Sequence, residues 1–149
     1  MSNASSSVRL SAQERIESVK AGLIAAIAGG LTGFFLGILK TLFGEVTLGP
    51  ELILSIAITT FCSFLFGITY RYIVRQDANP HLRSGALGAF ALVRGLSKIE
   101  ATWSNALPMM SYVDMLGESF GIFAIAQLTL DFAITHALVK PFGSAERLP

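Results

Sequence analysis

Charged residues are scarce in this chain. They make up 14% of its 149 residues, whereas hydrophobic residues make up 52% and the mean hydropathy is +0.62. Soluble domains usually carry about 25% charged residues, so a chain this poor in charge would have difficulty covering its surface in water. The net charge is only +1, and no basic face stands out. We therefore do not expect the protein to bind nucleic acid. We expect it to be embedded in a lipid bilayer.

Cysteine and histidine are also nearly absent. Cys62 alone cannot build a disulfide framework or a cysteine-based metal site, and we interpret it as a small buried hydrophobe. His81 and His136 each lack a second ligand at a metal-binding spacing. We therefore expect no metal and no cofactor, and ligation of a tetrapyrrole metal by His136 is the alternative.

Motifs of known catalytic chemistry are missing too. The sequence contains no nucleophile elbow, no phosphate-binding glycine loop, no HExxH and no paired CxxC, and we expect no enzymatic activity. The first twenty residues are polar and hold no apolar stretch of the kind found in signal peptides, so we expect no cleaved leader.

Apolar runs dominate what is present. Residues 21–43, 51–74 and 115–139 are each long enough to cross a hydrocarbon core of about 30 Å at about 1.5 Å per residue. Residues 85–97 form a shorter, weaker run that spans only if the helix continues to about residue 106. The sequence predicts an all-α polytopic membrane protein with a bundle of four transmembrane helices. A re-entrant or interfacial segment is the alternative for the third.

Polar segments divide the chain into three parts. Residues 1–20 form a polar arm in which Ser11 and Glu14 match a capping box, so a short amphipathic helix is expected to start near residue 12 and run into the first span. Residues 21–140 form the membrane domain, and residues 141–149 a polar tail.

Prolines mark the expected breaks. Pro80 makes a continuous helix through the connection 75–85 unfavourable, and Pro108 predicts a break over residues 106–115. The last apolar run is expected to continue to Lys140.

Basic residues are distributed unequally between the two sides that four spans create. One side holds Arg9, Arg15, Lys20, Arg71, Arg75, Arg83, Lys140 and Arg147. The other side has only Lys40 and Lys98 near its boundary. The positive-inside rule then predicts that both termini are cytoplasmic.

Small residues recur on the first span. Ala25, Gly29, Gly33 and Gly37 follow one another at intervals of four, so they form a stripe on one helix face, and Gly22, Ala26 and Gly30 form an adjacent stripe. In lipid, small residues let helix backbones approach closely. We interpret the stripe as a packing seam of the glycine-zipper kind, which faces either another span or a partner chain. Gly85, Gly88, Ala89 and Gly95 give the third helix a small face as well.

Polar residues inside the spans are the candidate functional site. Arg94 lies near the middle of the third helix, where an unpaired arginine costs at least about 2.5–3.5 kcal/mol. The last span contributes Glu118, Gln127 and Asp131, and we expect Glu118 or Asp131 to neutralise Arg94. Lys98, one turn further along, could meet Glu118 or Asp114.

These polar residues favour a buried ion pair that fixes the helix register. A path for ions or a polar solute is the alternative, as is contact with a partner protein, a lipid headgroup or a pigment. Glu118 and Thr129 share one face of the last span, whereas Gln127, Asp131 and Thr135 share another. The two sets do not merge into one polar stripe, which weakens the channel hypothesis.

Residues 66–96, FGITYRYIVRQDANPHLRSGALGAFALVRGL, resemble a family of small integral membrane proteins found in cyanobacteria and plastids. The similarity rests on Phe66-Gly67, Tyr70-Arg71-Tyr72, Arg75-Gln76-Asp77, the segment Gly85–Phe90 and Val93-Arg94-Gly95. It implies a photosynthetic membrane, carries no catalytic residues, and fits a bacterial member better than a plastid one. It draws attention to a charged loop on the inner side, made of Arg71, Arg75, Asp77 and Arg83.

A second similarity is remote. Four-span preprotein and amino-acid transporters of mitochondria and plastids share the span count and the glycine-rich helices. Residues 67–70 start their Gly-x-x-aromatic signature, but His81 stands where that signature requires arginine, and no aspartate follows at the required interval.

Taken together, these features favour an accessory subunit or an assembly or scaffold factor. Its seams and charged loop would contact other membrane proteins or a second copy of the chain, in the thylakoid or plasma membrane of a cyanobacterium. The alternative is a transporter or channel for a small solute or ion that uses Arg94 and the intramembrane carboxylates.

Overall fold

The computed structural model describes residues 12–44, 49–74 and 80–140, and these residues form helices without strands. The four main helices are α1 (Ala12–Leu42), α2 (Pro50–Ile73), α3 (Pro80–Thr102) and α4 (Met109–Thr135), with a 3-10 turn, η1 (Trp103–Asn105), before α4. Three of them, α1 from Glu14 onward, α2 and α4, are long and apolar enough to cross a membrane. The chain is therefore an all-helical protein compatible with a multi-pass membrane topology.

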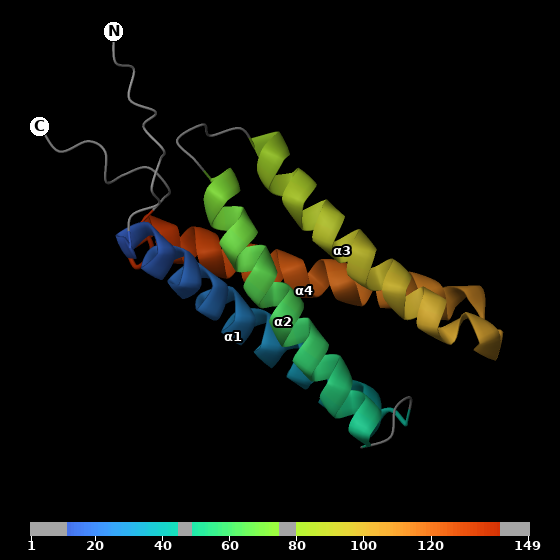
Figure 1. The fold of residues 1–149 in the computed structure, drawn as a ribbon. Coiled ribbons are helices and arrows are strands. Elements are labelled where there is room, and N and C mark those ends of the chain that lie inside the picture. The colour runs from blue at the N-terminus through green and yellow to red at the C-terminus, as the bar shows by residue number, and fades with distance from the viewer. Residues whose placement is uncertain (1–11, 45–48, 75–79, 141–149) are drawn as a thin grey trace, which may run out of the picture.

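The helices form two antiparallel hairpins, α1–α2 and α3–α4 (Figure 1). We call the end with the connections 43–49 and 103–108 the hairpin end, and the end where α1 begins and α4 finishes the terminal end. The α1 helix packs closely on α2 and also on α4, whereas α3 packs mainly on α4 and less on α2. Towards the hairpin end the two hairpins diverge (Figure 1).

The surface of the bundle suits a lipid-like environment. Large apolar side chains are exposed along all four main helices, including Ile27 (62%), Phe61 (62%), Val93 (68%) and Leu128 (68%). In water, such a continuous apolar surface would drive aggregation. The buried core is small and aromatic, centred on Phe66, Tyr70 and Phe123 with alanines around them.

The small stripe of α1 lies against α2 of the same chain. A Cβ on Gly33 would meet Thr59, and one on Gly37 would meet the Leu52 side chain. Gly29 lies beside Ser63 in the same way, and Ala25 faces Gly67. Of the two orientations left open for this stripe, the structure has the one directed at another helix of the same chain.

Gly67 of α2 makes the closest backbone approach in this interface. A Cβ built there would stand 2.5 Å from the carbonyl oxygen of Ala21, 2.7 Å from the Cβ of Ala25 and 2.9 Å from the Cα of Gly22. Two of these three atoms belong to the backbone, which cannot rotate away. Only glycine fits this position without separating the helices.

Residues 12–20, expected to form a helix that runs into the first span, belong to the continuous helix α1, and residues 1–11 lie outside the described residues. The helix boundaries differ from the sequence expectation in three other places, which are the starts of α3 and α4 and the end of α4. Helix α3 begins at Pro80, and α4 begins directly after Pro108. Both prolines mark a helix start, because the first helical residues need no N–H partner.

The fourth helix ends earlier than expected, at Thr135. Ala137 adopts a left-handed conformation with φ of 56°, the Leu138 N–H donates to the carbonyl of Ala133 at 2.9 Å, and the Ala137 N–H donates to that of Ile134 at 3.1 Å. This pattern is a Schellman motif, which reverses the chain at a helix end. Val139 then folds back into the core, where it is fully buried.

Replacing Gly67 with alanine tests the backbone contact. The new methyl group must push the Ala21 carbonyl away, and overpacking of this kind costs about 1–3 kcal/mol. We expect a lower melting temperature in mild detergent, measured by circular dichroism. Gly88→Ala is the matched control, since a Cβ there meets no atom within 4 Å; it is expected to be neutral or stabilising, as alanine is the better helix former. Equal stability of both variants would contradict the close approach.

Candidate functional site

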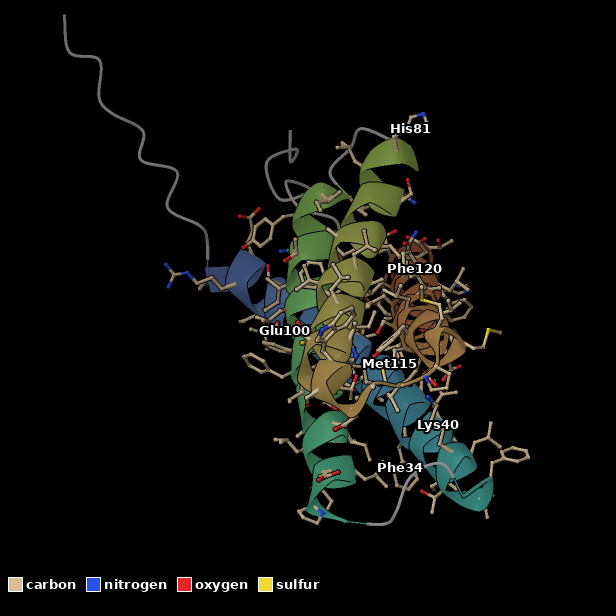
Figure 2. All side chains as sticks on the ribbon, turned by 90° about the vertical axis from the view of Figure 1, so that its right-hand side faces the viewer. Phe34, Lys40, His81, Glu100, Met115 and Phe120 are labelled. Carbon is tan, nitrogen blue, oxygen red and sulfur yellow. The ribbon has the colours of Figure 1, made fainter. Side chains whose placement is uncertain are left out.

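Several charged residues of the hairpin end come together as one cluster. Lys40 of α1 donates from Nζ to Oδ2 of Asp114 at 2.7 Å and to Oε2 of Glu118 at 2.9 Å. Lys98 of α3 donates from Nζ to Oε1 of Glu118 at 2.6 Å. Figure 2 shows Lys40 near Met115 of α4. Both lie far from His81, which marks the terminal end of α3. We call Lys40, Arg94, Lys98, Asp114 and Glu118 the hairpin-end cluster.

Glu118 is the centre of this cluster. Its side chain is only 11% exposed and its two carboxylate oxygens each accept from a different lysine. It thus joins α1, α3 and α4 through a single residue. In this position the negative charge of Glu118 is neutralised by the two lysines. Removing one member of the group would leave an unpaired charge in surroundings that solvate it poorly. Glu118 was one of the two partners expected for Lys98.

Arg94 has a different partner from those expected. It is 7% exposed, and its Nη2 donates to the hydroxyl of Thr59 on α2, which in turn donates to the carbonyl oxygen of Ser55 at 2.6 Å. No ion pair joins Arg94 to a carboxylate among the described residues. Its Nε is buried and has no hydrogen-bond partner there. The neutralisation of Arg94 by a direct bond to Glu118 or Asp131 is therefore not observed.

Asp131 and Gln127 lie in a separate polar group. Asp131 accepts from the Tyr70 hydroxyl at 2.7 Å and lies 3.5 Å from Nη1 of Arg83, so it joins α4 to α2 and α3. The Oε1 atom of Gln127 is buried without a hydrogen-bond partner among the described residues. Asp131 does not meet Arg94, because these two residues lie in different halves of the bundle.

Aromatic side chains separate the two polar groups. The ring of Phe66 stands 5.4 Å from that of Phe90 and 5.3 Å from that of Phe123, and Phe90 and Phe123 are 5.8 Å apart. The ring of Tyr70 also packs on Phe66, in a tilted arrangement at 5.4 Å. This aromatic layer fills the middle of the bundle. The polar residues therefore form two separate groups, one on each side of the layer, instead of one continuous path.

Arg71 occupies a buried position that the charged-loop hypothesis did not foresee. It lies in the last turn of α2, is 2% exposed, and donates to the carbonyls of Glu14 and Lys140, each at 2.9 Å, and to the Ser18 hydroxyl at 2.6 Å. It therefore fastens the start of α1 and the chain after α4 to α2. Arg83 belongs to α3, and Arg75 and Asp77 lie outside the described residues.

Thr59, Ser18 and Tyr70 are site residues that the sequence analysis missed. Thr59 offered one signal, since it lies on α2 among long apolar side chains. Its pairing with Arg94 depends on how α2 and α3 pack, which the sequence pattern does not encode. Among the described residues, no group of three or more His, Cys, Asp and Glu side chains could hold a metal ion.

We compared the chain with family models, with curated proteins and with solved structures, and none of the three comparisons gave a match. Functional inference therefore depends on the geometry described above.

Glu118→Gln tests the central role of this carboxylate. The variant leaves Lys40 and Lys98 without their shared counterion, and loss of one partner from a buried pair costs about 3–5 kcal/mol. We expect a large loss of stability, measured by unfolding in mixed micelles of increasing SDS fraction. Asp114→Asn is the control, because Asp114 is 59% exposed and an exposed pair contributes at most about 1 kcal/mol. Similar losses in both variants would contradict the assignment of Glu118 as the bridge.

Proposed function

We propose that this protein is a non-enzymatic subunit or assembly factor of a membrane complex, which binds a transmembrane helix of a partner on the open face of α4. The observation that carries the proposal is the pair Gly117 and Gly121. They stand one turn apart on α4, and a Cβ on either would meet no atom within 4 Å.

The surroundings of this glycine pair suit helix docking. Met110, Val113, Ile125 and Leu128 are large exposed side chains on α4, so the glycines form a shallow depression within an apolar ridge. A depression of this kind lets a second helix approach closely and gain dispersion contacts, which drive association in lipid. The seam on α1 is already covered by α2, so the α4 face is the better candidate for an external partner.

We place the complex in a photosynthetic membrane, the thylakoid or plasma membrane of a cyanobacterium. The support for this setting is the similarity of residues 66–96 to a family of such membranes. The charge distribution favours cytoplasmic termini: Arg15, Lys20, Arg71 and Arg83 belong to the terminal end, against Lys40 and Lys98 at the hairpin end.

We also propose α3 as the fourth span. Its 23 residues make a helix of about 34 Å, longer than the hydrocarbon core of about 30 Å. Arg94 and Lys98 lower its hydropathy, but both are engaged by neighbouring helices at Thr59 and Glu118. Each cation is thus bonded to a protein group instead of standing unpaired among lipid tails.

Transport of a solute has less support. A path across the bundle would have to link the hairpin-end cluster with Asp131, and the rings of Phe66, Phe90 and Phe123 lie between them. The polar residues that the transport hypothesis uses are instead engaged in helix-to-helix bonds.

Cysteine labelling tests the α3 topology. In a Cys62→Ala background, Ser84→Cys and Ser104→Cys place thiols at exposed positions at the two ends of α3. If α3 spans, a membrane-impermeant maleimide should label residue 84 only from the cytoplasmic side and residue 104 only from the opposite side. Labelling of both thiols from one side would support the re-entrant alternative and exclude the four-span arrangement.

Partner binding is tested at the glycine pair. We expect Gly117→Leu to remove the proteins that co-purify with the tagged chain from native membranes in mild detergent, because leucine fills the depression. Ala57→Leu is the matched control, since Ala57 is exposed on α2, away from this face; it should retain the same proteins.

A flux assay in liposomes separates the two functions. No flux in the wild-type chain, together with partner loss only in Gly117→Leu, fits the scaffold. Solute flux that disappears in Arg94→Ala would instead establish the transporter, and retained partners in Gly117→Leu would exclude the α4 face.

A further inference from the structure

A groove runs between α2 and α3, which pack less on each other than on their hairpin partners. It has a volume of about 630 Å³, within the range of about 300–1,000 Å³ that small-ligand sites occupy. In Figure 2 the two helices run side by side. Apolar side chains line most of its length, among them Leu54, Ile58 and Leu65 of α2 and Phe90 and Val93 of α3.

Arg94 lines this groove about midway along it. The residue is 7% exposed, its Nη2 is bound to Thr59, and its Nε has no partner among the described residues. A buried guanidinium N–H without an acceptor is costly, and anionic oxygens are the acceptors it binds most strongly. Arg94 is therefore a strongly polar group in a largely apolar groove wall, and its Nε lacks an acceptor among the described residues.

The charge balance of the hairpin-end cluster points in the same direction. Lys40 and Lys98 share Glu118, and Lys40 also binds Asp114, so both carboxylates are occupied by lysines. Among the described residues, Arg94 is the cation of this cluster without a bonded carboxylate. An anionic oxygen at Arg94 would supply the acceptor that its guanidinium lacks.

From this juxtaposition we propose that the α2–α3 groove binds a bilayer lipid with a singly charged anionic headgroup. Its acid oxygens accept from Arg94, and an acyl chain lies along Ile58, Cys62 and Leu65. This inference goes beyond the proposed scaffold role and does not depend on it.

A bilayer lipid fits the groove better than a soluble anion. An inorganic anion would satisfy Arg94 but would leave the apolar walls formed by Ile58, Leu65 and Val93 uncovered. Glu51, in the first turn of α2, also lines the groove. Its carboxylate disfavours a second negative charge on the occupant, which is why the proposal specifies a singly charged headgroup.

Cys62 supplies the readout, because it lines the groove and is the single cysteine of the chain. The full-length chain, delipidated in dodecyl maltoside, is titrated with dioleoyl phosphatidylglycerol or dioleoyl phosphatidylcholine, and alkylation of Cys62 by N-ethylmaleimide is followed. Phosphatidylglycerol should protect Cys62 at concentrations about tenfold lower than phosphatidylcholine, as expected for one charge-assisted hydrogen bond. Inorganic phosphate should not protect it.

Four variants distinguish this site from general lipid binding. Arg94→Gln should abolish the preference between the two lipids while keeping a donor for Thr59, and Arg94→Lys should retain the preference. Val93→Trp should block the groove and remove the protection although Arg94 is intact. Arg15→Gln, the same substitution at an exposed arginine of α1, should behave as wild type.

The outcomes against the proposal are equally defined. Equal protection of the wild-type chain by both lipids, or an unchanged preference in Arg94→Gln, would overturn it. Protection by inorganic phosphate would show a soluble-anion site instead. If Arg94→Gln does not fold, Val93→Trp decides: unchanged protection by phosphatidylglycerol would place the lipid elsewhere.

Discussion

The close contact of α2 with the backbone of α1 at Gly67 is the constraint on which the rest of this structure depends. With no side chain at this position, α2 approaches the Ala21 carbonyl and the Gly22 Cα directly. Arg71 follows one turn later, so its guanidinium reaches Ser18 and the carbonyl of Glu14. The same group binds the carbonyl of Lys140, which the Schellman turn of α4 presents. A single glycine thus sets the geometry in which three helices are joined at the terminal end.

The two ends of the bundle use charge in different ways. At the terminal end, Arg71 binds mostly uncharged oxygens of the backbone and of Ser18. At the hairpin end, Glu118 bridges two lysines from different helices, and Arg94 has a hydroxyl partner but an Nε without an acceptor in the part of the chain that the structure describes. The aromatic layer of Phe66, Phe90 and Phe123 lies between the two ends. This asymmetry is why the hairpin end is the better place to look for a bound anion.

The sequence predicted much of the fold and less of the site. Length and hydropathy were sufficient for α1, α2 and α4, because a span must be apolar for about twenty residues whatever its neighbours are. Helix α3 was harder, since its polar residues are covered only by tertiary contacts. Pro80 and Pro108 indicated the two breaks, but α3 and α4 begin at or directly after these prolines, several residues earlier than the apolar runs suggested. For Arg71 and Arg94, the partners are a backbone carbonyl and a threonine on another helix, and no sequence pattern specifies such pairs.

The long sequence separations in the hairpin-end cluster have a consequence for biogenesis. Glu118 lies 20 residues after Lys98 and 78 residues after Lys40. At about 5–20 residues per second, a ribosome needs about 1–4 s to extend the chain from Lys98 to its carboxylate partner. During that interval the lysine has no counterion from α4, so lateral release of α3 into lipid on its own is unfavourable. The third and fourth helices are therefore expected to leave the translocon together, as a preformed pair.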